Sequence, residues 1–329
     1  MPYPAHYPAF KAYDVRGRMP DELNETLVHA IGRAYAQWLM ADTGKSSLKV
    51  VIGYDVRLSS LSFHGALAAG LQAEGASVTS IGLCGTEEVY FATFNYGFDG
   101  GIMITASHNP MDYNGLKFVR EDSKPVSADS GLKDIEARVH AVLQTNVTIM
   151  ASDTIASLGH RTDFVAHLLT YIDQAALKPL KIVVNAGNGG AGVVVDALEP
   201  YLPFELIKIH HAPDGTFPNG IPNPLLPENR HATAQAVIKH GADMGLAWDG
   251  DFDRCFFFDE HGGFIEGAYM VGLIAAALLQ TNPGAKIVHD PRVCWNTQDQ
   301  VRAAGGIPLF SKCGHAFIKE ALRREDALY

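Results

Sequence analysis

Three aspartates in the segment DGDFDR, residues 249–254, give the strongest indication of chemistry in this sequence. The segment holds Asp249, Asp251 and Asp253. Apolar stretches typical of strands flank it at 244–248 and 255–258. In an extended loop, alternate side chains project to the same side, so the three carboxylates would converge on one point. A hard divalent cation relieves their repulsion, and oxygen-only ligands favour Mg²⁺, Mn²⁺ or Ca²⁺ over zinc.

A calcium-binding EF-hand loop also carries acidic residues at alternate positions. Counted from Asp249, Glu260 falls at the twelfth position, where such a loop has its glutamate. The sixth position is Arg254, however, and the loop needs a glycine there for its turn. The flanks are strand-like rather than helical, so the EF-hand reading is rejected. A solvated acidic turn without an ion is the other alternative.

Ser107 is the second candidate, in the run TASHNPMDYNGLK at residues 105–117. The run follows a buried apolar stretch, so Ser107 would lie where the active sites of α/β proteins gather. A serine hydroxyl is a weak nucleophile that a base or a metal must activate. The adjacent His108 suggests an acyl-transferring hydrolase, but the G-x-S-x-G turn of such enzymes is absent. Taken alone, the run is also consistent with a structural loop.

The elements that must position these residues alternate between short apolar strands and longer helices. Strands are predicted at 48–53, 77–83 and 101–105, and helices at 60–73 and 129–143, with Gly75 placed to end the first helix. This alternation predicts an α/β fold with mixed, mostly parallel sheets.

One unit recurs along the chain, at residues 48–57, 180–189 and 285–294. Each copy has a lysine, an apolar strand and a polar turn, and in the first and third an aspartate precedes an arginine by two positions. We interpret the copies as three related α/β domains at 1–150, 151–258 and 259–329, divided near 145–153 and 259–263. Chance similarity between strand–helix units is the alternative.

The third unit is short. It predicts helices at 268–279 and 315–324 with strands at 286–289 and 307–310. Because the first two units are longer, we expect a third domain that is either small or incomplete.

Composition limits the classes of partner. The chain has 329 residues and a formal charge of −10, which disfavours binding to nucleic acid or to an anionic membrane. Its four cysteines form no C-x-x-C pair, so reduced thiols are expected. The first residues do not resemble a signal peptide, and the longest apolar run, 270–279, is too short to cross a membrane. We therefore expect a cytoplasmic protein that acts on a small molecule.

Taken together, the motifs resemble those of the α-D-phosphohexomutase family. The matching runs are KAYDVRG (11–17), GYDVR (53–57), GTEEVYFA (85–92), TASHNP (105–110), YNGLK (113–117), NAGNGGAG (185–192), DGTFPNGIPNPLLPE (214–228), DGDFDR (249–254) and GHAFIKE (314–320). They extend along essentially the whole chain. The sequence looks closest to the bacterial phosphomannomutases that supply GDP-mannose.

The resemblance implies a chemistry. Ser107 would carry a phosphoryl group, give it to a hexose monophosphate and regain one from a hexose 1,6-bisphosphate intermediate. The net reaction would exchange mannose 6-phosphate and mannose 1-phosphate. Mg²⁺ would bind Asp249, Asp251 and Asp253 together with an oxygen of phospho-Ser107. Glucose phosphate or glucosamine phosphate remains an alternative substrate.

The resemblance also implies roles for other residues. The catalytic set would be Ser107, Lys117, Arg16, Arg254 and His315, and the substrate contacts would be Tyr13, His108 and Arg292. Lys117 is expected to carry a proton, with a pKa lowered by neighbouring cations. Gly187, Asn188 and Gly189 look like a phosphate-cradling loop, but the resemblance places them in a structural turn.

The resemblance stops where family members continue. Their next features are a G-E-x-S-x-H loop that recognises sugar hydroxyls and a fourth domain that clamps the non-reacting phosphate. We therefore expect a partial third domain, no fourth domain and weak or absent mutase turnover in this 329-residue chain. A non-catalytic remnant is the alternative in another class, and a monomer or weak homo-oligomer is expected.

Overall fold

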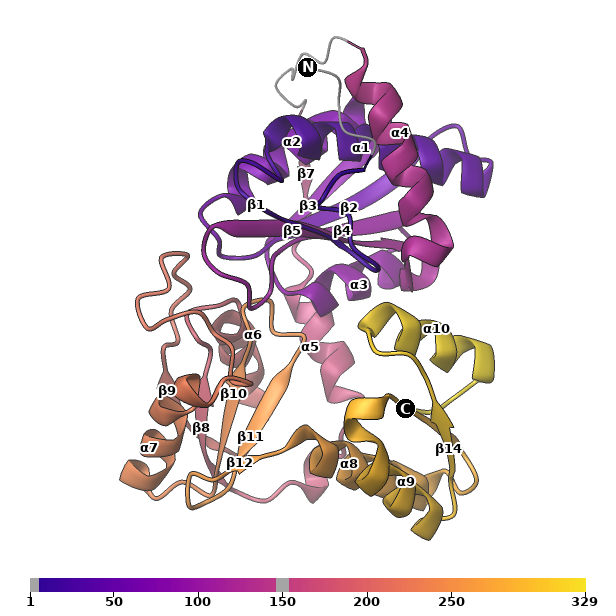
Figure 1. Ribbon diagram of the computed structural model, residues 1–329. Helices are drawn as coiled ribbons and strands as arrows, with labels where there is room; N and C mark the ends of the chain where they lie inside the picture. The colour runs from indigo at the N-terminus through magenta and orange to yellow at the C-terminus, as the bar shows by residue number, and fades with distance from the viewer. Residues whose placement is uncertain (1–5, 146–153) are drawn as a thin grey trace.

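The chain folds into three α/β blocks, which follow one another from the indigo to the yellow end of Figure 1. The computed structural model describes residues 6–145 and 154–329. The first block consists of residues 6–145 together with strand β7 (Ala156–Ser157), the second of residues 161–265 and the third of residues 267–329. Within the described residues, no helix combines the length and hydrophobicity needed to cross a bilayer.

The first block is built on a mixed sheet with the strand order β1-β5-β4-β2-β3-β7, and β6 pairs with β5. Strands β2, β3, β4 and β7 run parallel, whereas β5 is antiparallel to both β1 and β4. The further strands are β1 (Val15–Arg18), β2 (Lys49–Tyr54), β3 (Ser77–Leu83), β4 (Gly100–Ile104), β5 (Tyr113–Arg120) and β6 (Lys124–Pro125). Because β7 belongs to this sheet, the sheet extends past the predicted division at residue 150.

Helices cover both faces of this sheet, because successive side chains of each strand point to opposite faces. Val50 and Ile52 of β2 pack into a core with α1, α2 and α4, while Val51 faces a second core with α3. The helices are α1 (Glu25–Thr43), α2 (Ser60–Ala73), α3 (Thr86–Asn95) and α4 (Lys133–Leu143). Alternate residues of one strand therefore stabilise opposite layers.

The helix predicted at 129–143 starts later than expected. Residues Ala128–Leu132 form a separate wide turn, η2, and α4 begins at Lys133. Gly131 has a φ of 134°, which only glycine adopts easily, and a Cβ at this position would overlap the ring of Trp38. The polar residues before Lys133 thus form a turn that packs against α1.

The second block has a sheet with the order β12-β11-β10-β8-β9. Its strands are β8 (Lys181–Asn185), β9 (Glu205–Ile209), β10 (Met244–Trp248), β11 (Cys255–Phe258) and β12 (Phe264–Ile265), and its helices are α5 (Arg161–Leu169), α6 (Ala191–Leu198) and α7 (His231–His240). Strand β10 is parallel to β8 and antiparallel to β11. The segment 249–254 is therefore the tight connection between two neighbouring antiparallel strands.

The third block contains the parallel strands β13 (Lys286–His289) and β14 (Ile307–Phe310). Its helices are α8 (Gly267–Thr281), α9 (Cys294–Ala303) and α10 (His315–Glu325). On the side of β13 away from β14, Leu328 donates its N–H to the carbonyl of Lys286, and Val288 donates to that of Tyr329. The last residues of the chain therefore line up along β13.

The recurring unit has the same place in each block. The three copies form β2, β8 and β13, and each of these strands pairs in parallel with the next strand of its block. Short helical turns complete the connections: η1 (Glu121–Ser123), η3 (Gln174–Ala176), η4 (Glu199–Tyr201), η5 (Pro227–Asn229) and η6 (Pro291–Val293). The predicted fold class, consecutive related α/β domains with mixed sheets, is confirmed.

Candidate functional site

The Ser107 loop and the aspartate loop meet at the junction of the first and second blocks. Ser107 follows β4 and is fully buried, with a φ of 50°. Its hydroxyl donates a hydrogen bond of 2.5 Å to Asp249 Oδ2. A Cβ at Gly250 would lie 2.6 Å from the Ser107 carbonyl oxygen, so a glycine is needed for the two loops to approach this closely.

The three aspartates form a compact oxygen cluster. Each offers a carboxylate oxygen, and these oxygens lie within 4.8 Å of one another. One oxygen of Asp251 is buried without a hydrogen-bond partner among the described residues, and one of Asp253 is buried with no hydrogen bond and only a longer ion pair, 3.7 Å from Arg254. A buried, unpaired carboxylate oxygen is unfavourable unless a cation approaches it, and divalent cations with oxygen ligands suit this donor set. The residues present therefore fit a hard metal ion such as Mg²⁺.

The neighbours of the aspartates shift their pKa values in opposite directions. Burial raises the pKa of Asp249, and the nearby Asp251 carboxylate adds to the effect. Burial also opposes ionisation of Asp251, but Lys117 and the Thr86 hydroxyl outweigh it and lower the pKa of that carboxyl. Asp251 is thus the member of the cluster that the surrounding protein stabilises most clearly as an anion.

Lys117 projects from β5 into this cluster and is itself buried. Its ammonium donates to Asp251 Oδ2 at 2.6 Å and to Asp253 Oδ2 at 2.7 Å. Burial lowers its pKa, but the two carboxylates overcome that effect and raise the pKa above the ordinary lysine value. The sequence-based expectation of a pKa lowered by neighbouring cations is therefore corrected, because the closest charged groups are anions.

Thr86, at the first position of α3, is a site residue that the sequence analysis did not single out. Its hydroxyl donates to Asp251 Oδ2 at 2.6 Å, and its backbone N–H donates to the Asp251 carbonyl at 3.2 Å. The turn before it is held by Glu88, which accepts the Gly85 N–H and also pairs with His160. The motif GTEEVYFA contained this residue, but its spacing carries no sign of a contact 165 positions away.

Arg57 is a second residue without a predicted role. Its side chain is 1% exposed, and its guanidinium donates to four backbone carbonyls of the Ser107 loop. These carbonyls belong to Ser107, Asn109, Pro110 and Tyr113. Burial lowers the pKa of Arg57, opposed by the Asp55 carboxylate 3.4 Å away. Arg57 therefore fixes the backbone that presents Ser107.

The same local geometry recurs at Arg292 of the third block. In both places the aspartate two positions earlier accepts the arginine's backbone N–H, at 3.0 Å for Asp55 and at 2.9 Å for Asp290, and also pairs with its guanidinium. Arg292 differs in being 70% exposed at its side chain. The hydrogen bond to Asp290 raises its pKa. The repeated Asp-x-Arg pattern was the signal that could have identified Arg57.

His108 and Arg254 lie on the open side of the Ser107 hydroxyl. His108 Nδ1 is 3.1 Å from Ser107 Oγ and 2.7 Å from an Arg254 guanidinium nitrogen. Arg254 Nε lies 3.7 Å from Asp253 and 3.9 Å from Asp249. With 40% of its side chain exposed, Arg254 can reach a group that enters from solvent.

The other predicted site residues lie around the Ser107 and aspartate loops but farther from the Ser107 hydroxyl. Arg16 donates to Asn109 and to Asp14, while its buried Nε has no partner among the described residues. A Cβ at Gly314 would lie 3.3 Å from the ring of Tyr13, so this tyrosine faces the third block. His315 begins α10, but its side chain lies outside the described part of the structure.

The glycine-rich turn after β8 has its amides engaged within the protein. Asn188 donates its N–H to His210, and Gly189 donates to Ala186. The Asn188 side chain bonds Ala212 and Asn219. Because these groups already have partners, the turn has a structural role and does not offer a phosphate cradle.

Comparisons with known proteins indicate the same family over nearly the whole chain. Family models described as phosphoglucomutase/phosphomannomutase, alpha/beta/alpha domains I, II and III match residues 8–146, 162–263 and 266–329. "Phosphohexose mutases" of Xanthomonas campestris pv. campestris are 60% identical over 325 residues, covering 98% of this chain and 70% of the relative. A "Phosphomannomutase" of Salmonella typhimurium is 58% identical, covering 97% of this chain and 70% of the relative.

A solved structure gives the same result. The crystal structure of a phosphoglucomutase/phosphomannomutase family protein from Burkholderia thailandensis has a TM-score of 0.87 and 33% sequence identity. The match covers 97% of this chain and 69% of that one. Sequence and fold therefore point to the same group of proteins, of which this chain spans about 70% of the length of the relatives.

Proposed function

The chain belongs to the phosphoglucomutase/phosphomannomutase family, and from this we propose that it interconverts mannose 6-phosphate and mannose 1-phosphate through a phosphorylated Ser107. Family membership makes it a phosphohexomutase, an intramolecular phosphotransferase of the isomerase class. The hydrogen bond from Ser107 to Asp249 carries the proposal, because it places a hydroxyl nucleophile directly beside a cluster suited to a metal ion.

In the proposed cycle the Ser107 oxygen gives its phosphoryl group to a free hydroxyl of a hexose monophosphate. The sugar hydroxyl loses its proton and the Ser107 oxygen gains one, so the products are a hexose 1,6-bisphosphate and the serine hydroxyl. The bisphosphate turns over in the site, its other phosphoryl group returns to Ser107, and the isomeric monophosphate leaves. The serine is regenerated in its phosphorylated form, so the cycle is balanced.

The proposed metal ligands are Asp249, Asp251, Asp253 and an oxygen of phosphorylated Ser107. Bound there, Mg²⁺ would supply charge stabilisation to the transferring phosphoryl group. Arg254 supports the same role from the open side, since its planar guanidinium matches phosphate oxygens. Lys117 is proposed as the proton carrier: held as an ammonium by Asp251 and Asp253, it would give a proton to the leaving oxygen and take one back from the attacking hydroxyl.

The remaining roles are proposals of the same kind. Arg16 and His108 flank the Ser107 loop and would hold phosphate or sugar oxygens. Tyr13 faces the third block, where Arg292 and His315 are proposed as sugar-phosphate contacts. The divisions at residues 150 and 258, the cytoplasmic location and the monomeric or weakly associated state stay predictions.

Mannose is the proposed sugar because several relatives at 55–58% identity are named phosphomannomutases. Supply of mannose 1-phosphate for GDP-mannose synthesis follows from that choice. Glucose phosphate is the second candidate, supported by the family description, which covers phosphoglucomutases as well.

Intact-protein mass spectrometry would test the proposal. The chain is incubated with glucose 1,6-bisphosphate and Mg²⁺, and a gain of one phosphoryl group is expected. Ser107→Ala should remove the gain, and the control Ser62→Ala, an exposed serine on α2, should keep it. Mannose 6-phosphate should then discharge the phosphorylated chain faster than glucose 6-phosphate does. A phosphoryl gain that persists in Ser107→Ala would refute the assignment of the carrier.

A further inference from the structure

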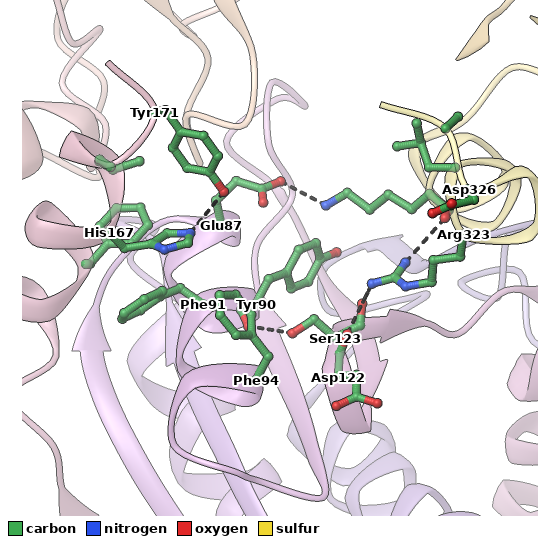
Figure 2. Close-up of a pocket in the computed structure, with 15 residues that line it drawn as sticks. Glu87, Tyr90, Phe91, Phe94, Asp122, Ser123, His167, Tyr171, Arg323 and Asp326 are labelled. Atoms are coloured by element: carbon green, nitrogen blue, oxygen red, sulfur yellow. Dashed lines mark hydrogen bonds and ion pairs between the residues drawn. The ribbon is translucent and has the colours of Figure 1, made fainter. Parts of the chain in front are cut away.

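Helix α10 of the third block contacts the first block through polar side chains. Lys319 Nζ lies 3.0 Å from a carboxylate oxygen of Glu87 and 4.0 Å from the ring centroid of Tyr90. Arg323 donates to the carbonyls of Asp122 and Ser123 at 3.1 Å and 3.2 Å. Figure 2 shows Arg323 reaching from α10 toward Asp122 and Ser123. Lys319 of the same helix binds Glu87 of α3, so one helix reaches two separate elements.

Both of those elements also hold the candidate metal site. Glu87 and Tyr90 belong to α3, whose first residue, Thr86, donates to Asp251. Asp122 and Ser123 form the turn that directly follows β5, the strand that carries Lys117. The contacts of α10 therefore reach α3 and the turn after β5, and both α3 and β5 carry a residue that binds the same oxygen of Asp251.

The turn after β5 is conformationally demanding. Asp122 and Ser123 have φ values of 56° and 54°, in the left-handed region that residues with side chains rarely adopt. Such a conformation persists when surrounding contacts hold it. Arg323 supplies part of that support by binding both carbonyls of the turn.

The start of α10 lies beside Tyr13, in the segment of the first block that also carries Arg16. Gly314 immediately precedes the helix and packs against Tyr13 of the first block. Because a helix is stiff, the docking of Lys319 and Arg323 sets the position of the segment 311–315 one to two turns earlier. That segment carries the proposed sugar-phosphate contact His315.

Apolar packing contributes little to the contact between α10 and the first block. A groove of about 570 Å³ separates α10 from α3 and α5, and apolar side chains such as Phe94, Tyr171 and Leu322 line it (Figure 2). By contrast, a buried apolar cluster that includes Phe91 and Phe164 joins the first and second blocks. Among the described residues, no buried apolar cluster spans α10 and the first block.

We propose that Lys319 and Arg323 are positioning residues, which dock the third block so that its segment 311–315 faces the Ser107 site. The proposal rests on the proposed function, because that function gives the segment its role. Neither side chain touches the reacting atoms. They act through α10 on the segment before it, whereas Thr86 and Lys117 hold Asp251 by contacts of their own.

Hydrogen exchange and phosphoryl transfer would be measured on the full 329-residue chain. The test variant is the double substitution Lys319→Met/Arg323→Gln. The matched control is Arg324→Gln, a neighbouring exposed arginine that bonds only Glu325 of its own helix among the described residues. The conservative double variant Lys319→Arg/Arg323→Lys keeps both charges. Glu87→Gln removes the anion opposite Lys319 from the other block.

The test variant should increase amide exchange about tenfold in 311–318 and in the turn 121–123. Losing two exposed polar contacts should change the opening equilibrium that governs exchange by roughly that factor. It should raise the KM for glucose 1,6-bisphosphate in Ser107 phosphorylation severalfold, with a smaller change in kcat. Mg²⁺ affinity should stay within about twofold. Glu87→Gln should move both quantities in the same direction, and the conservative variant should restore both.

Unchanged exchange in the test variant would overturn the docking role, whether or not the chain reacts. Faster exchange with an unaltered KM would overturn the positioning role. If the unmodified chain takes up no phosphoryl group, the proposed function fails, and exchange alone then decides whether Lys319 and Arg323 dock the helix.

Discussion

Ser107 and Asp249 are joined by a hydrogen bond of 2.5 Å although 142 positions of sequence separate them. Ser107 lies in the loop that follows β4 of the first block, and Asp249 begins the turn between two strands of the second. The candidate site thus exists only when the two sheets hold a fixed relative position. The apolar contact between α3 and α5, through Phe91 and Phe164, stabilises that position.

Replacement of Arg57 by Met should destabilise the chain by roughly 3–5 kcal/mol, because it leaves a buried aspartate unpaired and four loop carbonyls without their donor. Urea unfolding followed by circular dichroism would measure the loss. Arg292→Met is the matched control, since the arginine of the same Asp-x-Arg turn is exposed there, and it should change stability by less than about 0.5 kcal/mol. Equal losses in the two variants would contradict the role of burial.

Replacement of Lys117 by Met should tighten Mg²⁺ binding by at least about tenfold, because a positive charge next to Asp251 and Asp253 competes with the ion. The same change should slow Ser107 phosphorylation, and added Mg²⁺ should recover stability lost in the ion-free variant. Isothermal titration calorimetry measures the affinity. Lys124→Met, an exposed lysine on β6 next to β5, should leave it unchanged. Weaker Mg²⁺ binding in Lys117→Met would count against a metal at these aspartates.

Acid should weaken the first block partly through His64. This histidine on α2 is buried, its Nε2 lies 2.8 Å from the Ser80 hydroxyl, and burial lowers its pKa from 6.5. The unfolded chain therefore binds a proton at higher pH than the folded chain does. Stability is complete above the unfolded pKa of 6.5 and falls as the pH drops toward the lower folded value.

The His64 effect can be isolated by substitution. The decrease in urea midpoint between about pH 7.5 and about pH 5.5 should be smaller in His64→Gln than in the unmodified chain. Burial also lowers the pKa of His29 and His210, so part of the decrease should remain. His261→Gln, an exposed control, should show the full decrease. A full decrease in His64→Gln as well would exclude this histidine as a source.

Local pattern was sufficient for much of the fold. The predicted helix 60–73 and strand 77–83 coincide with α2 and β3, because apolar periodicity marks both and Gly75 separates them. Strand β5 was not among the predicted strands, although it pairs on both sides and carries Lys117. No local pattern within β5 itself indicates that β1 and β4 are its partners.

In the candidate site, too, only features set by residues close together in the sequence could be predicted. The spacing within 249–254 places three carboxylates together, and the structure clusters them. Thr86 contacts a residue 165 positions away, and Arg57 contacts residues about 50 positions away, so no local sequence pattern indicates these contacts. The charge environment of Lys117 could not be predicted from its sequence neighbours either, because its two partners lie more than 130 positions away.

The complete burial of Ser107 has a consequence for the lifetime of its modified form. An enzyme that stores a phosphoryl group between turnovers loses that group if water attacks before a sugar does. Excluding water from the site suppresses this side reaction. On the proposed chemistry, the covered serine would retain its phosphoryl group through long intervals without substrate, and the chain would resume turnover without being primed again.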